Sequence, residues 1–74
     1  MALVEEPYLV RADCIPVGRY VRFEREGQAS WERLFAAPRY NGLVFLWTKD
    51  DAGDIHRTQV RSTDYMRVAR EELR

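Results

Sequence analysis

The sequence predicts a mainly β fold: a small single domain, built as an antiparallel meander of four to five short strands and ending in a C-terminal helix. Two observations carry this prediction. Apolar and polar residues alternate along much of the chain, which is the period of a half-buried strand. Turn residues separate the alternating runs, as at Asn41-Gly42 and Asp51-Ala52-Gly53. At 74 residues, the chain has the length of one domain.

The clearest element is a β-hairpin from Asn41 to Arg61. Asn-Gly at its start suits a type I′ turn, because both central residues of that turn need positive φ. Asp51-Ala52-Gly53 suits a three-residue loop closed by a left-handed glycine. With that loop Trp47 lies opposite Arg57, whereas a four-residue loop would slip the pairing and place Trp47 beside His56.

The first strand of this hairpin, residues 43–47, is continuously apolar. Such a run is typical of a strand that is covered on both faces, so we expect it at the centre of the sheet. Residues 19–25 form a preceding strand with Val21 and Phe23 toward the core. Residues 29–37 form the next strand. A short helical turn from Ser30 is the weaker alternative there.

The two ends of the chain are predicted from their turn and capping residues. Residues 1–7 are expected to be a flexible tail, because Glu5-Glu6-Pro7 is polar and ends in proline. Ser62-Thr63-Asp64 can cap a helix over residues 65–74. Its apolar stripe would be Tyr65, Val68, Ala69 and Leu73. A last strand over residues 65–69, closing a small barrel, is the alternative to this helix.

The layout consists of short strands joined by tight turns, and it begins with the stretch Val-Gly-Arg-Tyr-Val-Arg-Phe from Val17 to Phe23. In this layout the chain resembles a small SH3-like barrel from about Val17 to Val68. The resemblance implies a closed or nearly closed barrel. It is one of pattern, so it carries over no functional residues.

Composition narrows the classes of partner. Lys plus Arg and Asp plus Glu are both 12, so the formal net charge is zero, and this opposes bulk phosphate binding. Eleven of the cations are Arg, which base composition explains more simply than selection for stacked recognition. The single Cys14 excludes an internal disulfide and favours a reducing cytoplasm. No apolar run has the length of a membrane helix, so no membrane partner is expected.

Residues with catalytic or metal-binding chemistry are sparse. Asp50, Asp51 and Asp54 share one turn, but their spacing does not match a calcium loop, and a solvated turn is the simpler interpretation. Cys14 and His56 are the only thiol and imidazole, too few for a zinc site. We therefore expect no enzyme activity, no metal and no cofactor.

The functional prediction is a small non-enzymatic binding module that uses an arginine and aromatic sheet face. A protein partner is favoured because these residue types are enriched at protein interfaces. A nucleic-acid-binding barrel is the alternative, and a homo-oligomeric assembly subunit is the second. The small size suggests a bacterial or phage accessory protein. The simpler interpretation is that the aromatic residues build the core. The candidate binding residues are Trp31, Arg33, Tyr40, Trp47, Arg57 and Arg61.

Overall fold

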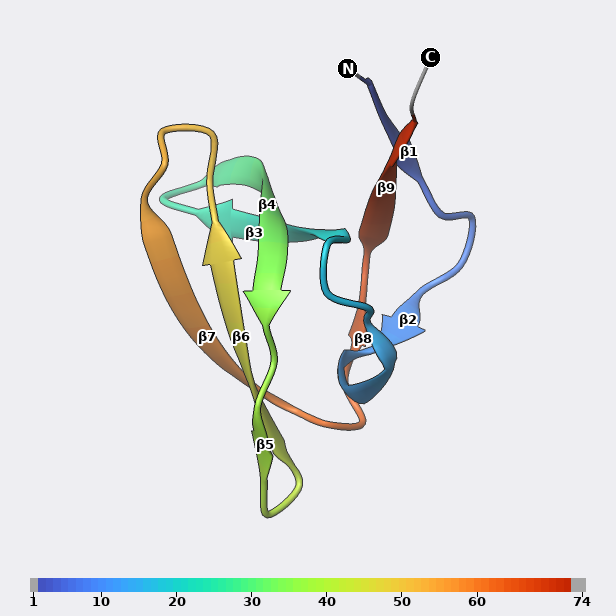
Figure 1. The fold of residues 1–74 in the computed structure, drawn as a ribbon, viewed down its shortest axis with the longest axis vertical. Coiled ribbons are helices and arrows are strands. Elements are labelled where there is room, and N and C mark those ends of the chain that lie inside the picture. Colours follow the sequence, from blue (N-terminus) through green and yellow to red (C-terminus); the bar gives the residue numbers. More distant parts are fainter. Residues whose placement is uncertain (1, 73–74) are drawn as a thin grey trace.

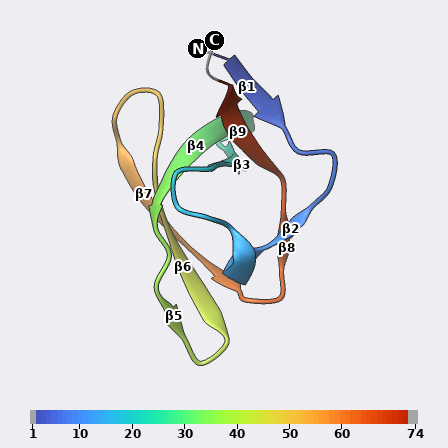
Figure 2. The same cartoon turned by 45° about the vertical axis from the view of Figure 1, so that its right-hand side comes forward.

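The structure is a computed structural model that describes residues 2–72, and its main feature is a strongly curved antiparallel sheet (Figures 1 and 2). Among the described residues there are nine strands and one short 3-10 turn. Their bounds are β1 Ala2–Glu5, β2 Val10–Arg11, η1 Ala12–Cys14, β3 Tyr20–Arg25, β4 Gln28–Ala36, β5 Arg39–Tyr40, β6 Leu43–Lys49, β7 Ile55–Arg61, β8 Tyr65–Met66 and β9 Val68–Glu72.

The large sheet has the strand order β1-β9-β3-β4-β6, and β5 and β7 also pair with β6. Since the same two residues of β6 pair with both β5 and β7, these strands flank it on opposite sides, and β5 continues the line of β4. β2 and β8 form a separate two-stranded ribbon. Within the described residues no pairing joins β7 back to the rest of the sheet, so barrel closure is not found.

Tight turns of the predicted types join the hairpins. Asn41 and Gly42 have φ of 49° and 76°, the positive pair that a type I′ turn requires. The loop between β6 and β7 has three residues and ends at Gly53, whose φ is 87°. The amide of Asp50 donates to the carbonyl of Asp54 at 3.0 Å, closing that loop. The three-residue register is therefore confirmed, with Trp47 opposite Arg57.

The core lies on the concave side of the curved sheet. Val21 and Phe23 are buried, as the alternation of β3 predicted. The turn η1 and the β2/β8 ribbon cover one end of this core. The buried apolar side chains packed there are Ala12, Ile15, Val21, Phe23, Leu34, Val44, Leu46 and Val68.

The predicted C-terminal helix is wrong. Residues 65–72 form β8 and β9 instead, and Leu73 of the predicted stripe lies outside the described residues. β9 lies between β1 and β3, and its first two residues, Val68 and Ala69, are both buried. An isolated helix here would have placed two glutamates at its negative end. Backbone pairing on both sides of β9 outweighs this weak local preference for a helix.

The predicted flexible tail is also wrong, because Ala2–Glu5 forms the strand β1, which pairs with β9. Met1 lies outside the described residues. Arg67 holds Glu5 at 2.7 Å, and Arg70 holds Glu6 at 2.8 Å. These partners come from the far end of the chain, so local polarity gave no sign of them. The strand count exceeds the predicted four to five for two reasons: the predicted tail and helix form strands, and the two-residue strands β2, β5 and β8 carry no readable alternation.

The central strand β6 is covered fully on one face only. Val44 and Leu46 are completely buried, but Leu43, Phe45 and Trp47 on the other face are only half-buried. The continuous apolar run therefore predicted the central position correctly and the double cover incorrectly. No helix among residues 2–72 is long and apolar enough to cross a membrane.

Leu46→Ala should lower the free energy of unfolding by about 2–5 kcal/mol, because it opens a cavity in the core. Leu43→Ala removes the same atoms from the half-buried face of the same strand and should cost clearly less. Urea denaturation followed by tryptophan fluorescence measures both changes. Equal losses would contradict the assignment of the two faces of β6.

Candidate functional site

The outer, convex face of β4, β5, β6 and β7 gathers most of the predicted binding residues. Residues paired across neighbouring strands share a face, so the register decides which side chains meet there. It brings together three rows: Arg33, Lys49 and Ile55; Ala36, Trp47 and Arg57; and Tyr40, Leu43 and Arg61.

Aromatic rings and one guanidinium form the centre of this surface. The rings of Phe35 and Trp47 are 6.4 Å apart between centroids and tilted by 50°. The Cζ atom of Arg57 lies 5.8 Å from the centroid of Trp47 and 5.9 Å from that of Phe45. We call Phe35, Phe45, Trp47 and Arg57 the aromatic–arginine face. Each cation–π contact of this kind contributes about 0.5–1 kcal/mol at an exposed site.

The charges on this surface have one sign. Arg33, Lys49, Arg57 and Arg61 are all exposed, and none makes an ion pair with the residues that the structure describes. No carboxylate shares their face, because the only acidic residue of β4, β6 or β7 is the inward-facing Glu32. A chain of zero net charge has thus separated its charges, and four cations without ion pairs to described residues surround the partly exposed aromatic rings.

Four other arginines are neutralised locally. Arg11, Arg25, Arg67 and Arg70 each hold a carboxylate at 2.6–2.8 Å, on Asp13, Glu32, Glu5 and Glu6 respectively. Arg19, Arg22 and Arg39 also make no ion pair with described residues, but the register places none of them in the three rows of the outer face.

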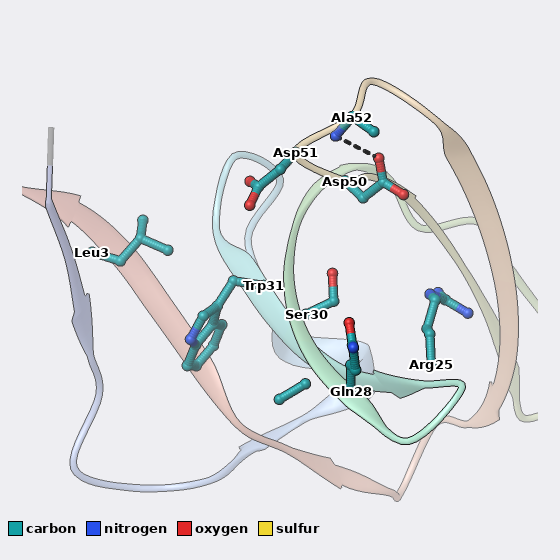
Figure 3. A pocket seen from close by; sticks show the side chains of 9 residues that line it. Leu3, Arg25, Gln28, Ser30, Trp31, Asp50, Asp51 and Ala52 are labelled. Carbon is teal, nitrogen blue, oxygen red and sulfur yellow. Dashed lines mark hydrogen bonds between the residues drawn. The ribbon is translucent and has the colours of Figure 1, made fainter.

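Trp31 lies apart from the other candidate residues, at the pairing of β4 with β3. It lies beside its cross-strand partner Arg22, whose Cζ is 5.6 Å from the ring centroid. It also borders an open hollow of about 500 Å³. Figure 3 shows Trp31 and Leu3 toward one end of this hollow and Arg25 toward the other. Tyr40 lies at the tip of the β5–β6 hairpin and is 69% exposed.

Sequence reasoning missed Phe35, Phe45 and Lys49 as members of the site. Phe45 could have been found, because the three-residue register already places it on the face of Trp47 and next to Arg57 diagonally. Phe35 had a signal too, because the alternation of residues 29–37 places it on the face of Trp31 and Arg33. The β-bulge between Leu34 and Ala36 shifts the register, so that Ala36, not Phe35, lies directly opposite Trp47.

A polar cluster lies on the opposite, inner face of the same strands. Arg25 donates from Nε and Nη2 to the two carboxylate oxygens of Glu32, at 2.6 and 2.9 Å. Thr48 donates to the same carboxylate at 2.7 Å, and Arg25 also reaches the hydroxyl of Thr58 at 3.2 Å. Burial raises the pKa of Glu32, but the hydrogen bonds from Arg25 and Thr48 outweigh burial and hold that pKa below its ordinary value.

The acidic turn is held by its own hydrogen bonds. The carboxylate of Asp50 accepts from the amides of Ala52 and Asp54 at 3.0 and 2.9 Å, and His56 Nε2 lies 2.7 Å from its second oxygen. The hydrogen bond with His56 is the largest cause that lowers the pKa of Asp50. Such contacts are typical of a structural turn. Within residues 2–72, no group of three or more His, Cys, Asp or Glu side chains could hold a metal ion.

The two residues with nucleophilic chemistry have separate partners. The thiol of Cys14, in η1, donates to Asp13 at 3.3 Å. This hydrogen bond raises the pKa of Cys14 and disfavours the reactive thiolate. His56, on β7, pairs with Asp50 instead. The structure therefore does not bring the thiol and the imidazole together.

Comparison with known proteins adds no relative. No family model, curated protein or solved structure matches the chain. The function is therefore argued from the geometry and charge of the site.

Glu32→Gln should lower the free energy of unfolding at neutral pH by about 2–3 kcal/mol, because it removes the charge from a buried, charge-assisted hydrogen-bond pair. Since the folded state lowers the pKa of Glu32, its stabilisation is present above the ordinary pKa of 4.5 and is lost as the pH falls through the folded-state value. The difference in stability between the two proteins should therefore shrink on acidification. Urea denaturation at a series of pH values measures this difference.

Glu24→Gln is the matched control, since Glu24 is exposed on the neighbouring strand β3. It should leave the stability nearly unchanged. A pH-independent gap between wild type and Glu32→Gln would contradict the role given to this carboxylate.

Proposed function

We propose that this protein is a non-enzymatic binding module that holds a protein partner on its aromatic–arginine face. The observation that carries the proposal is the set of four cations without ion pairs to described residues, arranged around three partly exposed aromatic rings. Arginine and large aromatic residues dominate the energetics of protein interfaces, and lysine contributes less. We therefore expect Arg57 and the aromatic rings beneath it to supply most of the binding energy of this surface.

The contacts of Arg57 support binding on this face. Arg57 lies over two rings at about equal distance, so its guanidinium is already ordered before a partner arrives. Ordering a side chain in advance reduces the entropy lost on association. The open hollows elsewhere on the surface have mixed charge and offer no comparable cluster of rings.

We also propose that the fold is an SH3-like barrel. The meander β3-β4-β6-β7 and the return of β9 to pair with β3 support it. The open side between β7 and the rest of the sheet argues for a partly opened version. We also propose a cytoplasmic location, because the exposed Cys14 thiol stays reduced in such surroundings.

Replacing Arg57 and Arg61 by Gln should reduce partner capture at least about tenfold, because it removes two cations from the centre and end of the site. The matched control replaces Arg11 and Arg67, which lose the same charge but belong to local ion pairs. Tagged proteins are incubated with a lysate of the source cells, and the retained proteins are quantified by mass spectrometry. Equal retention by both double variants would contradict the proposal.

Nucleic-acid binding is the second candidate, favoured by the same one-sided charge. Single strands are bound by aromatic rings on which bases stack, flanked by cations that follow the phosphates. Four cations and three rings meet that requirement locally, although the zero net charge gives no long-range attraction.

If this candidate is correct, a single-stranded oligonucleotide binds at low salt and its affinity falls with a log–log slope of about −3, since roughly 0.7 counterions are released per phosphate neutralised. Fluorescence anisotropy over a salt series measures the slope. Absent binding, or binding that does not respond to salt, removes the candidate.

A further inference from the structure

The strand β7 is an edge of the sheet, and its hydrogen-bonding pattern shows which of its backbone groups are free. Asp50 and Asp54 form a hydrogen-bonded pair, as do Gly42 and Ser62. Such pairs alternate with non-hydrogen-bonded ones along an antiparallel ladder. The amides and carbonyls of residues 56, 58 and 60 therefore point toward β6, and those of residues 55, 57, 59 and 61 point outward.

The outward groups at the end of β7 are already used. The amide of Arg61 donates to the carboxylate of Asp64 at 2.9 Å, and the carbonyl of Arg61 accepts from the amide of Asp64 at 3.0 Å. Ile55, Arg57 and Gln59 are left with three amides and three carbonyls along one edge. No described strand pairs with that side, and Figure 1 shows β7 on the outside of the sheet. A free ladder of this length is a template for one added strand.

The side chains beside this edge determine what kind of strand fits. Ile55 is 59% exposed, while Arg57 and Arg61 on the same face make no ion pair with any residue from 2 to 72. A second copy of the chain is a poor match. Two-fold antiparallel pairing of residues 55–59 places Arg57 directly opposite its own copy, and like charges in that position are destabilising.

We propose that β7 accepts an extended acidic segment of the partner protein as an additional antiparallel strand. The inference rests on the proposed function and names the partner's chemistry. Carboxylates of the segment lie opposite Arg61 and Arg57, a polar residue lies opposite Gln59, and an apolar residue covers Ile55. From its N-terminal end, the segment therefore has an acidic, a polar, an acidic and an apolar residue at every second position. Backbone hydrogen bonds supply affinity, and the alternate side chains supply specificity.

The test uses a defined probe, the peptide acetyl-Glu-Thr-Gln-Thr-Glu-Thr-Val-amide, titrated at low ionic strength into the ¹⁵N-labelled full chain. We expect saturable shifts of the amides of Ile55, Arg57 and Gln59. A peptide with both Glu replaced by Lys should bind roughly tenfold more weakly, since two exposed ion pairs are lost. A peptide N-methylated at Gln, the second Glu and Val keeps its charges but loses its edge-facing amides, and should not bind.

The charge-reversed protein gives an internal control for correct folding. Arg57→Glu together with Arg61→Glu should lose the acidic peptide and gain the Lys peptide, by a similar factor. A merely damaged sheet would bind neither peptide, and that result would overturn the proposal, as would equal binding of both peptides by the wild type.

The remaining outcomes separate this inference from the broader function. If the N-methylated acidic peptide binds as well as its parent, the edge proposal is overturned while binding on the aromatic–arginine face stands. If an oligonucleotide shifts the amides of β7 and no peptide does, both are overturned. If light scattering shows a dimer that protects the β7 amides, a second copy occupies the edge and the acidic-strand proposal is overturned.

Discussion

The register between β6 and β7 is the constraint on which the rest of the molecule depends. It is set by one loop, in which Gly53 takes a left-handed conformation and the amide of Asp50 closes onto Asp54. Because side chains alternate with a period of two, a slip of one residue would exchange the faces of one whole strand. In the observed register Val44 and Leu46 enter the core, and Trp47 meets Arg57 outside. Core and candidate site are thus two consequences of the same turn.

The two faces of these strands use arginine differently. On the inner face Arg25 holds the buried carboxylate of Glu32 through two hydrogen bonds, with Thr48 completing the set. A buried carboxylate without these donors would carry a large desolvation penalty. On the outer face Arg57 lies on aromatic rings and makes no ion pair with described residues. One residue type therefore stabilises the interior on one face of the sheet and leaves a cation available for recognition on the other.

The same arrangement explains why a neutral chain can have a one-sided surface. The carboxylates are placed where they close the fold: Glu5 and Glu6 bind the arginines that flank or belong to β9, and Asp50 holds its own turn. None of them reaches the outer face of β6 and β7. Overall charge is therefore a poor guide to the local field, and zero net charge does not oppose a polyanionic partner at this one surface. The edge of β7 restricts the kind of partner, because its free backbone groups pair with an extended strand and not with a globular surface.

The sequence by itself determined what depends on neighbouring residues. Asn41-Gly42 and Asp51-Ala52-Gly53 have the conformational freedom for their turns, and alternation placed Val21 and Phe23 inside; these predictions, and the contact of Trp47 with Arg57, are confirmed. The tertiary structure decided what depends on distant partners. Residues 68–72 became a strand because β1 and β3 pair with β9 on its two sides, and residues 65–66 pair with β2. A bulge between Leu34 and Ala36 placed Ala36 opposite Trp47, which no local pattern shows. Local propensities are worth a few tenths of a kcal/mol per residue, and long-range pairing overrides them.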